Sequence, residues 1–464
     1  MLHLLKQYFP IRNIIFFIVE GCIIFGTVLV SSVIVTFSPS YLFDTLLVLR
    51  IALITFICQI CLYYNDLYDF EISSTIGEII IRLLQALGVT SIALAVIYFI
   101  FPLVIIDQKV FILSLLLLII FIVGWRLIYI QVLNRGLFNQ RIIILGSSNL
   151  AKEIFKAVST TIECGYCVSV IVPDAEDEKL GIEIPDTVVI HTEKENLCQI
   201  ALEAGVNKVV VALKEKRGSF PTKELLTCRT AGIEVIEGSS FFEMLTGKVL
   251  VKMINPSWLI FSDGFRKSGI ENFFKRSEDI IISSVMLLLL SPLLIFTAVL
   301  IKLESKGDVF FSQKRVGLYE QEYMMHKFRS MKEDAEKLTG PVWAENNDPR
   351  ITKVGRFIRK VRIDELPQLW NVLTGKMSMV GPRPERKHFT DELKQKIPFY
   401  SERFNVKPGL TGWAQVSYDY GATLEDAVEK LNYELFYIKN LSLAMDIVIV
   451  LRTVKTVLFG RGSR

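Results

Sequence analysis

Cysteine is sparse in this chain, and its distribution excludes a scaffold built on disulfides. Seven cysteines are scattered over 464 residues, so nothing indicates the dense framework of a small secreted domain, and we expect a reducing compartment. Cys22, Cys58 and Cys61 lie within long apolar runs. Cys164 and Cys167 are spaced like a redox or zinc pair, but we interpret them as small core residues that flank a strand.

A signal-peptide cleavage site is absent from the first apolar run. Residues 14–37 are apolar and follow Lys6 and Arg12, and no small-residue motif ends the run, so we predict a retained membrane span. Hydrophobic residues make up 51% of the chain, which is too high a share for an ordinary soluble enzyme. Three further runs have about the 20 residues that a helix needs to cross the hydrocarbon. They cover residues 42–64, 79–101 and 110–130.

Basic residues predict how these spans are oriented. The two basic residues named above precede the first span, and the link at residues 38–41 carries neither Lys nor Arg. Arg126, Arg135 and Arg141 lie at or after the end of the fourth span. Because cytoplasmic loops are enriched in Lys and Arg, we expect this four-span domain, residues 1–135, to begin and end on the cytoplasmic side.

The next stretch, residues 136–264, alternates short β-branched strands with helical patterns, which indicates a parallel, doubly wound α/β sheet. A dinucleotide fingerprint reads GxGxxG, but the first turn reads GSSNLA, with Ser148 at the second glycine. That glycine lets the backbone approach a pyrophosphate. We therefore predict a Rossmann-like module that does not bind NAD and has a regulatory or dimerisation role. The expected strands are residues 141–145, 168–172, 188–191, 208–213 and 235–236.

A fifth apolar run is interrupted near its centre. Residues 280–301 contain Ser291 and Pro292, and proline kinks a helix because it lacks the N–H and clashes with the preceding turn. Basic residues flank both ends of the run, which suits a helix that enters and leaves the membrane by one face. We predict a re-entrant helix over about residues 277–301 rather than a fifth span. It would belong to a catalytic domain of residues 265–464.

The remainder, residues 302–464, indicates a compact α+β unit with an excess of basic residues. Strands are expected at residues 309–313 and 323–327, with a basic helix at 353–362 and an interfacial helix at 433–458. Beside a membrane, such a basic excess suggests anionic lipid, phosphate or nucleotide partners. We expect no nucleic acid partner.

Two adjacent carboxylates, Asp364 and Glu365, follow the basic helix. We expect Asp364 to cap the start of a helix that ends before Gly375, where the helix dipole and nearby Arg stabilise its anion. An ionised carboxylate can act as a nucleophile or a metal ligand. A capping Asp followed by a first-turn Glu is the simpler alternative, and on spacing alone it is the stronger one. The expected buried face of this helix consists of Leu366, Leu369, Trp370 and Leu373.

Arginines surround this pair in the sequence. Arg359 and Arg362 run directly into it, and the planar donor fork of Arg matches phosphate oxygens. Arg383 lies between Pro382 and Pro384, which hold the backbone stiff and extended and so pre-position the guanidinium. An ordinary surface turn is the alternative interpretation of this PRP motif.

In combination, these residues resemble the bacterial sugar transferase family, the polyprenyl-phosphate hexose-1-phosphate transferases. The resemblance covers about residues 273–460 and depends on several motifs in a fixed order. The four spans and the Rossmann-like module resemble the long form of that family, by architecture rather than by motif. The matching segments are the helix interrupted by Pro292, QKRVG at 313–317, KFRSM at 327–331, DPRI at 348–351, RIDELPQ at 362–368, VGPRPE at 380–385 and PGLTGW at 408–413.

The resemblance implies a two-step phosphosugar transfer that requires Mg²⁺. The Asp that matches Asp364 attacks the sugar-linked phosphate of a UDP-hexose and releases UMP, and undecaprenyl phosphate then accepts the phosphosugar. Glu365 matches the Mg²⁺ ligand. The substrate-binding positions that the resemblance implies are Arg359, Arg383 and Pro384 of the PRP motif, and Lys327 and Arg329.

The resemblance also implies a place in the cell. The reaction would be the first membrane step of exopolysaccharide or O-antigen assembly, in the lipid bilayer of the bacterial inner membrane, with the catalytic domain on the cytoplasmic face. The extra module suggests a homodimer. No residue indicates which hexose is transferred.

Two other functions stay open at this point. A membrane-anchored nucleotide-sugar dehydratase or epimerase would need an intact GxGxxG and a Tyr-xxx-Lys pair in the same domain, but Tyr323 and Lys327 lie far outside the module. A non-catalytic polysaccharide scaffold would tolerate the loss of Asp364 or Glu365.

Overall fold

The structure is a computed structural model whose chain separates into two compact units, Met1–Phe241 and Phe242–Arg464. The division falls within α9 (Gly238–Thr246), and the predicted domain boundaries near residues 135 and 264 stay predictions. Some predictions concern residues outside those that the structure describes: Lys6, residues 37–44, Arg135 and residues 348–349. The structure describes residues 11–36, 45–68, 76–134, 139–161, 164–173, 185, 188–191, 196–213, 220–253, 264–265, 268–332, 350–418, 421 and 423–458.

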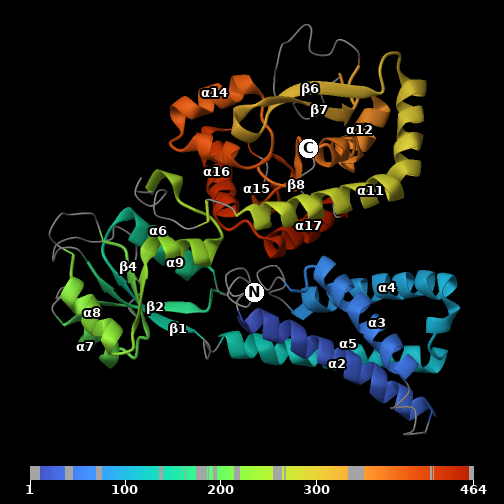
Figure 1. Ribbon diagram of the computed structural model, residues 1–464. Helices are drawn as coiled ribbons and strands as arrows, with labels where there is room; N and C mark the ends of the chain where they lie inside the picture. Colours follow the sequence, from blue (N-terminus) through green and yellow to red (C-terminus); the bar gives the residue numbers. More distant parts are fainter. Residues whose placement is uncertain are drawn as a thin grey trace. The chain divides into compact units, whose positions relative to one another are not determined.

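Four long apolar helices open the first unit and confirm the four predicted apolar segments (Figure 1). Each is long and apolar enough to cross a bilayer, so the chain is a multi-pass membrane protein. α2 packs on α3 and α5, and α4 packs on α3 and α5. The bounds are Ile11–Thr36 (α2), Thr45–Tyr64 (α3), Ile76–Ile100 (α4) and Gln108–Asn134 (α5).

A buried ion pair joins α2 to α5 inside this bundle. Arg126 NH2 lies 2.6 Å from Glu20 Oε1, and the two side chains are 1% and 0% exposed. Arg126 also donates to the main-chain oxygen of Leu67, just after α3. A charge among apolar helices is expensive unless it is paired. Arg126 is therefore neutralised within the bundle. It is not a free basic residue at the end of the fourth span, so it does not support the predicted orientation.

The rest of the first unit is a five-stranded sheet, as predicted. The strand order is β3-β2-β1-β4-β5, and each neighbouring pair is parallel. Ile143, Leu145 and Val209 form a core with α7 and α8, while α6 contacts β1 and β2. The bounds are Gln140–Leu145 (β1), Asn149–Thr160 (α6), Tyr166–Val172 (β2), Val189–Ile190 (β3), Leu197–Glu203 (α7), Lys208–Val211 (β4), Thr222–Thr230 (α8) and Glu234–Glu237 (β5).

The CxxC pair lies at the start of β2. Cys164 and Cys167 are free thiols, and the main-chain N–H of Tyr166 donates to Cys164 Sγ at 3.4 Å. Both side chains are half-buried. The predicted position beside a strand is confirmed, whereas the expectation that both are core residues is wrong.

The turn between β1 and α6 is closed by its own contacts. Gly146 has a φ of +124°, and a Cβ there would lie 2.2 Å from the main-chain oxygen of Ala212, which follows β4. Ser148 accepts from the N–H of Ala151 at 3.2 Å, which caps α6, and its hydroxyl donates to Ala212 O at 2.6 Å. The place that a dinucleotide-binding turn leaves for the pyrophosphate therefore holds a side chain bonded to the end of β4.

The second unit has the α+β architecture predicted for the C-terminal region. β6 and β7 form an antiparallel hairpin, and the short strands β8 and β9 pair in parallel. The bounds are Gly269–Glu304 (α11), Phe310–Val316 (β6), Glu322–Phe328 (β7), Lys353–Lys360 (α12), Gln368–Leu373 (α13), Ser378–Val380 (β8), Lys387–Lys396 (α14), Gly409–Thr411 (β9), Trp413–Ser417 (α15), Leu424–Lys439 (α16) and Leu443–Leu458 (α17).

α11 is the fifth apolar helix of the described chain, and it differs from the other four. Only 11% of its most apolar window is buried within the structure, against 22–39% for α2–α5. Leu288, Leu289 and Leu303 are 75%, 71% and 79% exposed, so most of its apolar surface packs against no protein. Such a surface needs lipid or a partner to cover it.

α11 bends sharply along its length, and Figure 1 shows two straight limbs that meet at the bend. Pro292 lies inside the helix and has no N–H for the main-chain oxygen of Leu288, four residues earlier. The hydroxyl of Ser291 donates to that oxygen at 2.8 Å instead. The Ser-Pro pair therefore permits a bend without leaving a main-chain acceptor unpaired in an apolar setting.

The single C-terminal helix predicted at residues 433–458 is wrong. α16 ends at Lys439 and α17 begins at Leu443, and Ser442 starts the new helix by accepting from the N–H of Met445 at 3.3 Å. Ser at a helix start competes with a continuous helix because its side chain bonds to the next turn. α17 keeps the expected exposed apolar stripe, formed by Leu443, Ile447, Leu451 and Val454.

Candidate active site

The two adjacent carboxylates lie at a tight corner between α12 and α13. α12 ends at Lys360, and Arg362 then adopts the left-handed conformation with a φ of +55°. This conformation costs a non-glycine residue about 1–2 kcal/mol. One 3₁₀ turn, η6 (Ile363–Glu365), follows before α13 begins at Gln368. Backbone strain of this kind persists only where surrounding contacts hold it, and it is common at functional sites.

Glu365 is the anionic centre of the corner. Lys327 Nζ, from β7, lies 3.1 Å from Oε1, and Arg383 NH2 lies 3.0 Å from the same oxygen. Arg362 NH1 is 3.7 Å from Oε2. Burial alone would raise the pKa of this carboxyl, but the three cations outweigh it and hold the pKa of Glu365 well below its usual range. Glu365 is therefore a fixed anion that gathers Lys327 and Arg383 at one point.

Asp364 has the opposite environment. No described residue donates a hydrogen bond to its carboxylate, and its side chain is half-buried, as that of Glu365 is. Burial, followed by the charge of Glu365, raises the pKa of Asp364 to about 6, although Lys327, Arg359 and Arg383 act in the opposite direction. At neutral pH the carboxylate is mostly ionised and more basic than an ordinary aspartate, which is the state that a nucleophile needs.

Two expectations about Asp364 are wrong. The residue lies within η6 and does not cap α13, whose N-cap position is Pro367, with no side-chain hydrogen bond. A helix dipole and nearby arginines were expected to favour its anion, but burial and the neighbouring carboxylate have the larger effect on its pKa. Adjacent carboxylates repel one another, and sequence spacing does not reveal which of the two gains the cations.

α13 is fixed to β7 by a buried amide that sequence reasoning missed. Asn371 Nδ2 donates to the main-chain oxygen of Met324 at 2.8 Å, and the N–H of His326 donates to Asn371 Oδ1 at 3.0 Å. These bonds pair the side chain with the strand as another strand would. Because Lys327 is the next residue of β7, they also fix its approach to Glu365.

The expected apolar face of α13 is confirmed only in part. Leu369 is fully buried, whereas Trp370 is 57% exposed, and Leu366 and Leu373 are half-buried. The buried positions are instead Gln368, Leu369, Asn371 and Val372. A buried amide on a short helix interrupts the apolar pattern, so the pattern alone places the wrong face inward.

The end of α13 is held by the first limb of α11. Arg276 donates from NH1 to Val372 O and from NH2 to Leu373 O, both at 2.7 Å. These are main-chain oxygens of the last turn, which have no partner within the helix. Gly375, with a φ of +82°, then ends the helix as predicted.

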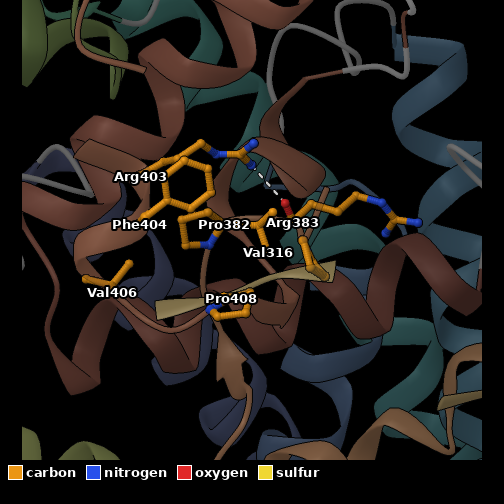
Figure 2. Close-up of a pocket in the computed structure, with 9 residues that line it drawn as sticks. Val316, Pro382, Arg383, Arg403, Phe404, Val406 and Pro408 are labelled. Carbon is orange, nitrogen blue, oxygen red and sulfur yellow. Dashed lines mark hydrogen bonds between the residues drawn. The ribbon is translucent and has the colours of Figure 1, made fainter. Parts of the chain in front are cut away.

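The PRP motif brings Arg383 to the carboxylate pair from the other side. β8 leads into it, and the Arg383 guanidinium reaches Glu365 as described above. Figure 2 shows this side chain pointing away from a pocket lined by the motif's own prolines, Arg403, Phe404, Val406 and Pro408. The pocket therefore lies behind the motif, and Pro384 belongs to its wall. The sequence prediction that the two prolines aim Arg383 agrees with this geometry.

The other predicted substrate-binding residues divide into two groups. Arg359, in the last turn of α12, lies close enough to Asp364 to lower its pKa. Arg329 is directed elsewhere. It donates to Lys306 O at 2.8 Å, and to Ser305 O and Oγ at 3.0 and 2.9 Å. The structure thus brings Lys327, Arg359 and Arg383 together around the pair, and it engages Arg329 with the segment that follows α11.

The carboxylate pair fits a hard divalent cation in donor type. Mg²⁺ in proteins is held by one or two carboxylates together with water and substrate phosphates, rather than by a full protein cage. Across the part of the chain that the structure describes, no three His, Cys, Asp or Glu side chains gather as a cage would require. Glu365 Oε2 is less engaged than Oε1, which leaves Oε2 as the oxygen that would hold a cation.

Chemically, the corner combines two half-buried carboxylates with three nearby cations, Lys327, Arg359 and Arg383. It belongs to a unit that also carries the exposed apolar surfaces of α11 and α17. Such a site suits displacement at phosphorus on a substrate anchored in a membrane. Fold and site together define a multi-pass membrane protein that carries a carboxylate pair surrounded by cations.

Sequence comparisons agree with this class. The family described as bacterial sugar transferase matches residues 270–460, and the family described as CoA-binding domain matches residues 63–219. The exopolysaccharide production protein PSS of Rhizobium leguminosarum bv. phaseoli is 40% identical over 194 residues, which cover 40% of this chain and 97% of that protein. The chain belongs to the bacterial sugar transferase family, in the long form that carries the second domain.

Two longer relatives match over a smaller part of their length. The UDP-N-acetylgalactosamine-undecaprenyl-phosphate N-acetylgalactosaminephosphotransferase of Aeromonas hydrophila is 44% identical over 240 residues, 52% of this chain and 56% of that protein. The UDP-glucose:undecaprenyl-phosphate glucose-1-phosphate transferase of Escherichia coli K12 is 45% identical over 191 residues, 40% of each chain. The match thus spans about half of these relatives, and their names specify different sugars.

Proposed function

We propose that this chain transfers a sugar 1-phosphate from a UDP-sugar to undecaprenyl phosphate and releases UMP, as the first membrane step of polysaccharide assembly. The observation that carries the proposal is the contrast at the corner. Asp364, a carboxylate whose pKa is raised by burial and by its neighbour, lies beside an anion, Glu365, that holds two cations within 3.1 Å of one oxygen. The names of the relatives support the two substrates.

The proposed chemistry is two displacements at one phosphorus atom. A carboxylate oxygen of Asp364 attacks the sugar-linked phosphorus, an Asp–phosphorus bond forms, and the bond to the bridging oxygen breaks as UMP leaves. A phosphate oxygen of undecaprenyl phosphate then attacks the same phosphorus and displaces the aspartate. The product is the diphosphate-linked sugar, and the carboxylate returns to its starting state.

The cations have distinct tasks in this scheme. Lys327 and Arg383 bind the oxygens of the reacting phosphate, because Glu365 holds them where charge builds up as the UMP leaves. Arg359, near Asp364, offers a donor fork to a neighbouring phosphate. Mg²⁺, when held by Glu365 and the phosphates, would neutralise negative charge on the phosphate oxygens.

We further propose that α11 is re-entrant and that the second unit lies on the cytoplasmic face of the bacterial inner membrane. The bend at the Ser-Pro pair and the basic residues at both helix ends support this arrangement, and the nucleotide sugar is cytosolic. Protease tags inserted between residues 213 and 220 and after residue 464 should be cleaved from the same side of sealed vesicles. Cleavage from opposite sides would mean that α11 crosses the membrane.

The α/β module is proposed to be regulatory or to mediate dimers. Its sequence matches a CoA-binding domain family, but the closed turn at Gly146 and Ser148 does not fit a nucleotide at that point, so no cofactor is proposed there. Light scattering in detergent should show a dimer that is lost when residues 141–262 are removed. A monomeric full-length chain would contradict the dimer.

Nucleotide release tests the function directly. Purified protein is mixed with Mg²⁺, undecaprenyl phosphate and a panel of UDP-sugars that includes glucose and N-acetylgalactosamine, and UMP and UDP are measured separately. UMP release with one sugar is expected, and it names the donor. UDP release would mean ordinary glycosyl transfer. Release of neither UMP nor UDP would be evidence for a non-catalytic scaffold.

A further inference from the structure

The PRP segment has few main-chain donors of its own. Pro382 and Pro384 have no N–H, so the main-chain oxygens of the segment need donors from elsewhere. Gly409 N donates to Pro382 O at 2.9 Å, and Arg315 NH1 donates to Pro384 O at 3.2 Å. The oxygen between them, on Arg383 itself, accepts from a side chain, Arg403 NH2, at 2.8 Å.

Both terminal nitrogens of Arg403 are engaged around the PRP segment. It lies in the 3₁₀ turn η7 (Tyr400–Asn405) and is 5% exposed. NH2 also donates to Glu434 Oε1 at 2.8 Å, and NH1 donates to the Tyr400 hydroxyl at 2.5 Å. The rings of Tyr400 and Phe404 lie 5.0 and 5.7 Å from its guanidinium carbon. The terminal nitrogens of this guanidinium therefore hold protein groups, although the side chain also borders the pocket of Figure 2.

Glu434 explains how this charge is tolerated. The carboxylate is 5% exposed on α16, and a buried guanidinium without a counter-charge would cost several kcal/mol. Glu434 already neutralises the charge of Arg403. Neutralisation therefore does not explain why Arg403 also contacts Arg383 O. NH2 of Arg403 meets both oxygens while NH1 reaches the Tyr400 hydroxyl, and the single nitrogen of Lys cannot hold all three contacts in this planar arrangement.

We propose that Arg403 is a positioning residue that acts through Arg383. It fixes the main chain of the PRP segment from behind, on the pocket side seen in Figure 2, while the Arg383 side chain extends from the other side to Glu365. Arg403 thereby sets the point at which the Arg383 guanidinium meets the reacting phosphate. This inference rests on the proposed function for its catalytic consequence.

The test compares Arg403→Lys with the wild type in single-turnover UMP release. Lys keeps the charge beside Glu434 but loses the fork, so the rate constant should fall about 10- to 100-fold, since small misplacements of a catalytic group have effects of this size. KM for the UDP-sugar should change less than threefold. The reason is that Arg403 affects where the reacting phosphate lies and not how tightly the UDP-sugar binds.

Two further variants make the result specific. If Arg403 acts through Arg383, Arg403→Lys should cost little more in an Arg383→Ala background, because the effects of coupled residues are not additive. Glu243→Gln is the matched control, since it breaks a buried ion pair with Lys439 (2.8 Å) away from the PRP segment. It should lower thermal stability without changing the UMP rate. Full additivity of Arg403→Lys with Arg383→Ala would overturn the proposal.

Hydrogen exchange provides a readout that does not depend on activity. Arg403→Lys should speed exchange of the amides of Gly381, Arg383 and Glu385, and Glu243→Gln should not. Unchanged exchange in this segment would overturn the positioning contact whatever the kinetics. If the wild type released no UMP while exchange responded as expected, the proposed function would fail and the contact to the PRP main chain would stand.

Discussion

Two turns of this chain, one after a strand and one after a helix, have opposite characters. The β1–α6 turn and the α12–α13 corner each lead into a helix, and each carries a residue with positive φ, Gly146 and Arg362. In the first turn, Ser148 and Ala212 satisfy one another and close the space. In the second, the charged groups of Asp364, Lys327 and Arg383 are half-buried and lie close together.

The difference teaches where chemistry can occur in this fold. A doubly wound sheet offers a ready anion site at its first turn, yet here that turn is sealed by short polar contacts. The corner has no recognised nucleotide fingerprint, but its strained backbone presents charge that is only partly neutralised. The predictions below test whether activity depends on the corner and is independent of the β1–α6 turn.

The largest effect is expected from Asp364→Asn. Without the carboxylate no phosphorus–oxygen bond to the enzyme forms, so turnover should fall by a factor of about 10³ or more. The thermal midpoint should rise slightly, because a raised pKa means that the fold favours the neutral side chain. UMP release and a thermal melt in detergent measure both. Near-normal UMP release would refute the assignment of the nucleophile.

A smaller loss with the opposite change in stability is expected from Glu365→Gln. The neutral amide leaves Lys327 and Arg383 without their shared anion, so activity should fall about 100-fold and the thermal midpoint should drop. Breaking a buried pair by removing one partner costs about 3–5 kcal/mol. The same two assays apply. If both carboxylate variants changed stability in the same direction, the contrast between the two residues would be wrong.

The third prediction concerns pH. Asp364 reacts as an anion, and its raised pKa of about 6 means that the anion is lost as pH falls through 6. The rate of UMP release should therefore be flat above about pH 7 and fall up to tenfold per unit below the pKa. Single turnover without undecaprenyl phosphate avoids titration of the acceptor. A rate that stayed constant down to pH 5, with the fold intact by circular dichroism, would contradict the raised pKa.

The smallest effect is expected at the β1–α6 turn. Ser148→Ala removes the cap of α6 and the bond to Ala212 O, which should cost about 1 kcal/mol of module stability. The UMP rate should not change, because no step is assigned to this turn. Loss of activity in a variant that remains folded would show that the module takes part in the reaction.

Much of this architecture could be predicted from local sequence patterns. The apolar runs, the strands of the α/β module and the β6–β7 hairpin follow from periodicity and β-branched residues. The candidate pair Asp364 and Glu365 was predicted too, because the motifs around it are specific. These features depend on neighbours in the chain, and such neighbours are visible in a sequence.

The features that were missed depend on partners far away in the chain. Nothing local indicates that Asn371 would pair with β7, or that Arg126 would be neutralised by Glu20 inside the bundle. The split of the last helix depends on Ser442, one polar residue in an amphipathic stretch. The distribution of cations between two adjacent carboxylates is likewise set by the tertiary fold, which brings Lys327 and Arg383 to the same oxygen.

The central claim is that Asp364 becomes covalently bound to the phosphosugar. The most direct measurement is the intact mass of protein quenched in acid after incubation with UDP-sugar and Mg²⁺ in the absence of undecaprenyl phosphate, followed by peptide mapping. The account predicts a mass increase of one sugar phosphate on the peptide that contains Asp364, absent in Asp364→Asn and removed by added undecaprenyl phosphate. UMP release without any such adduct, or an adduct on another residue, would contradict it.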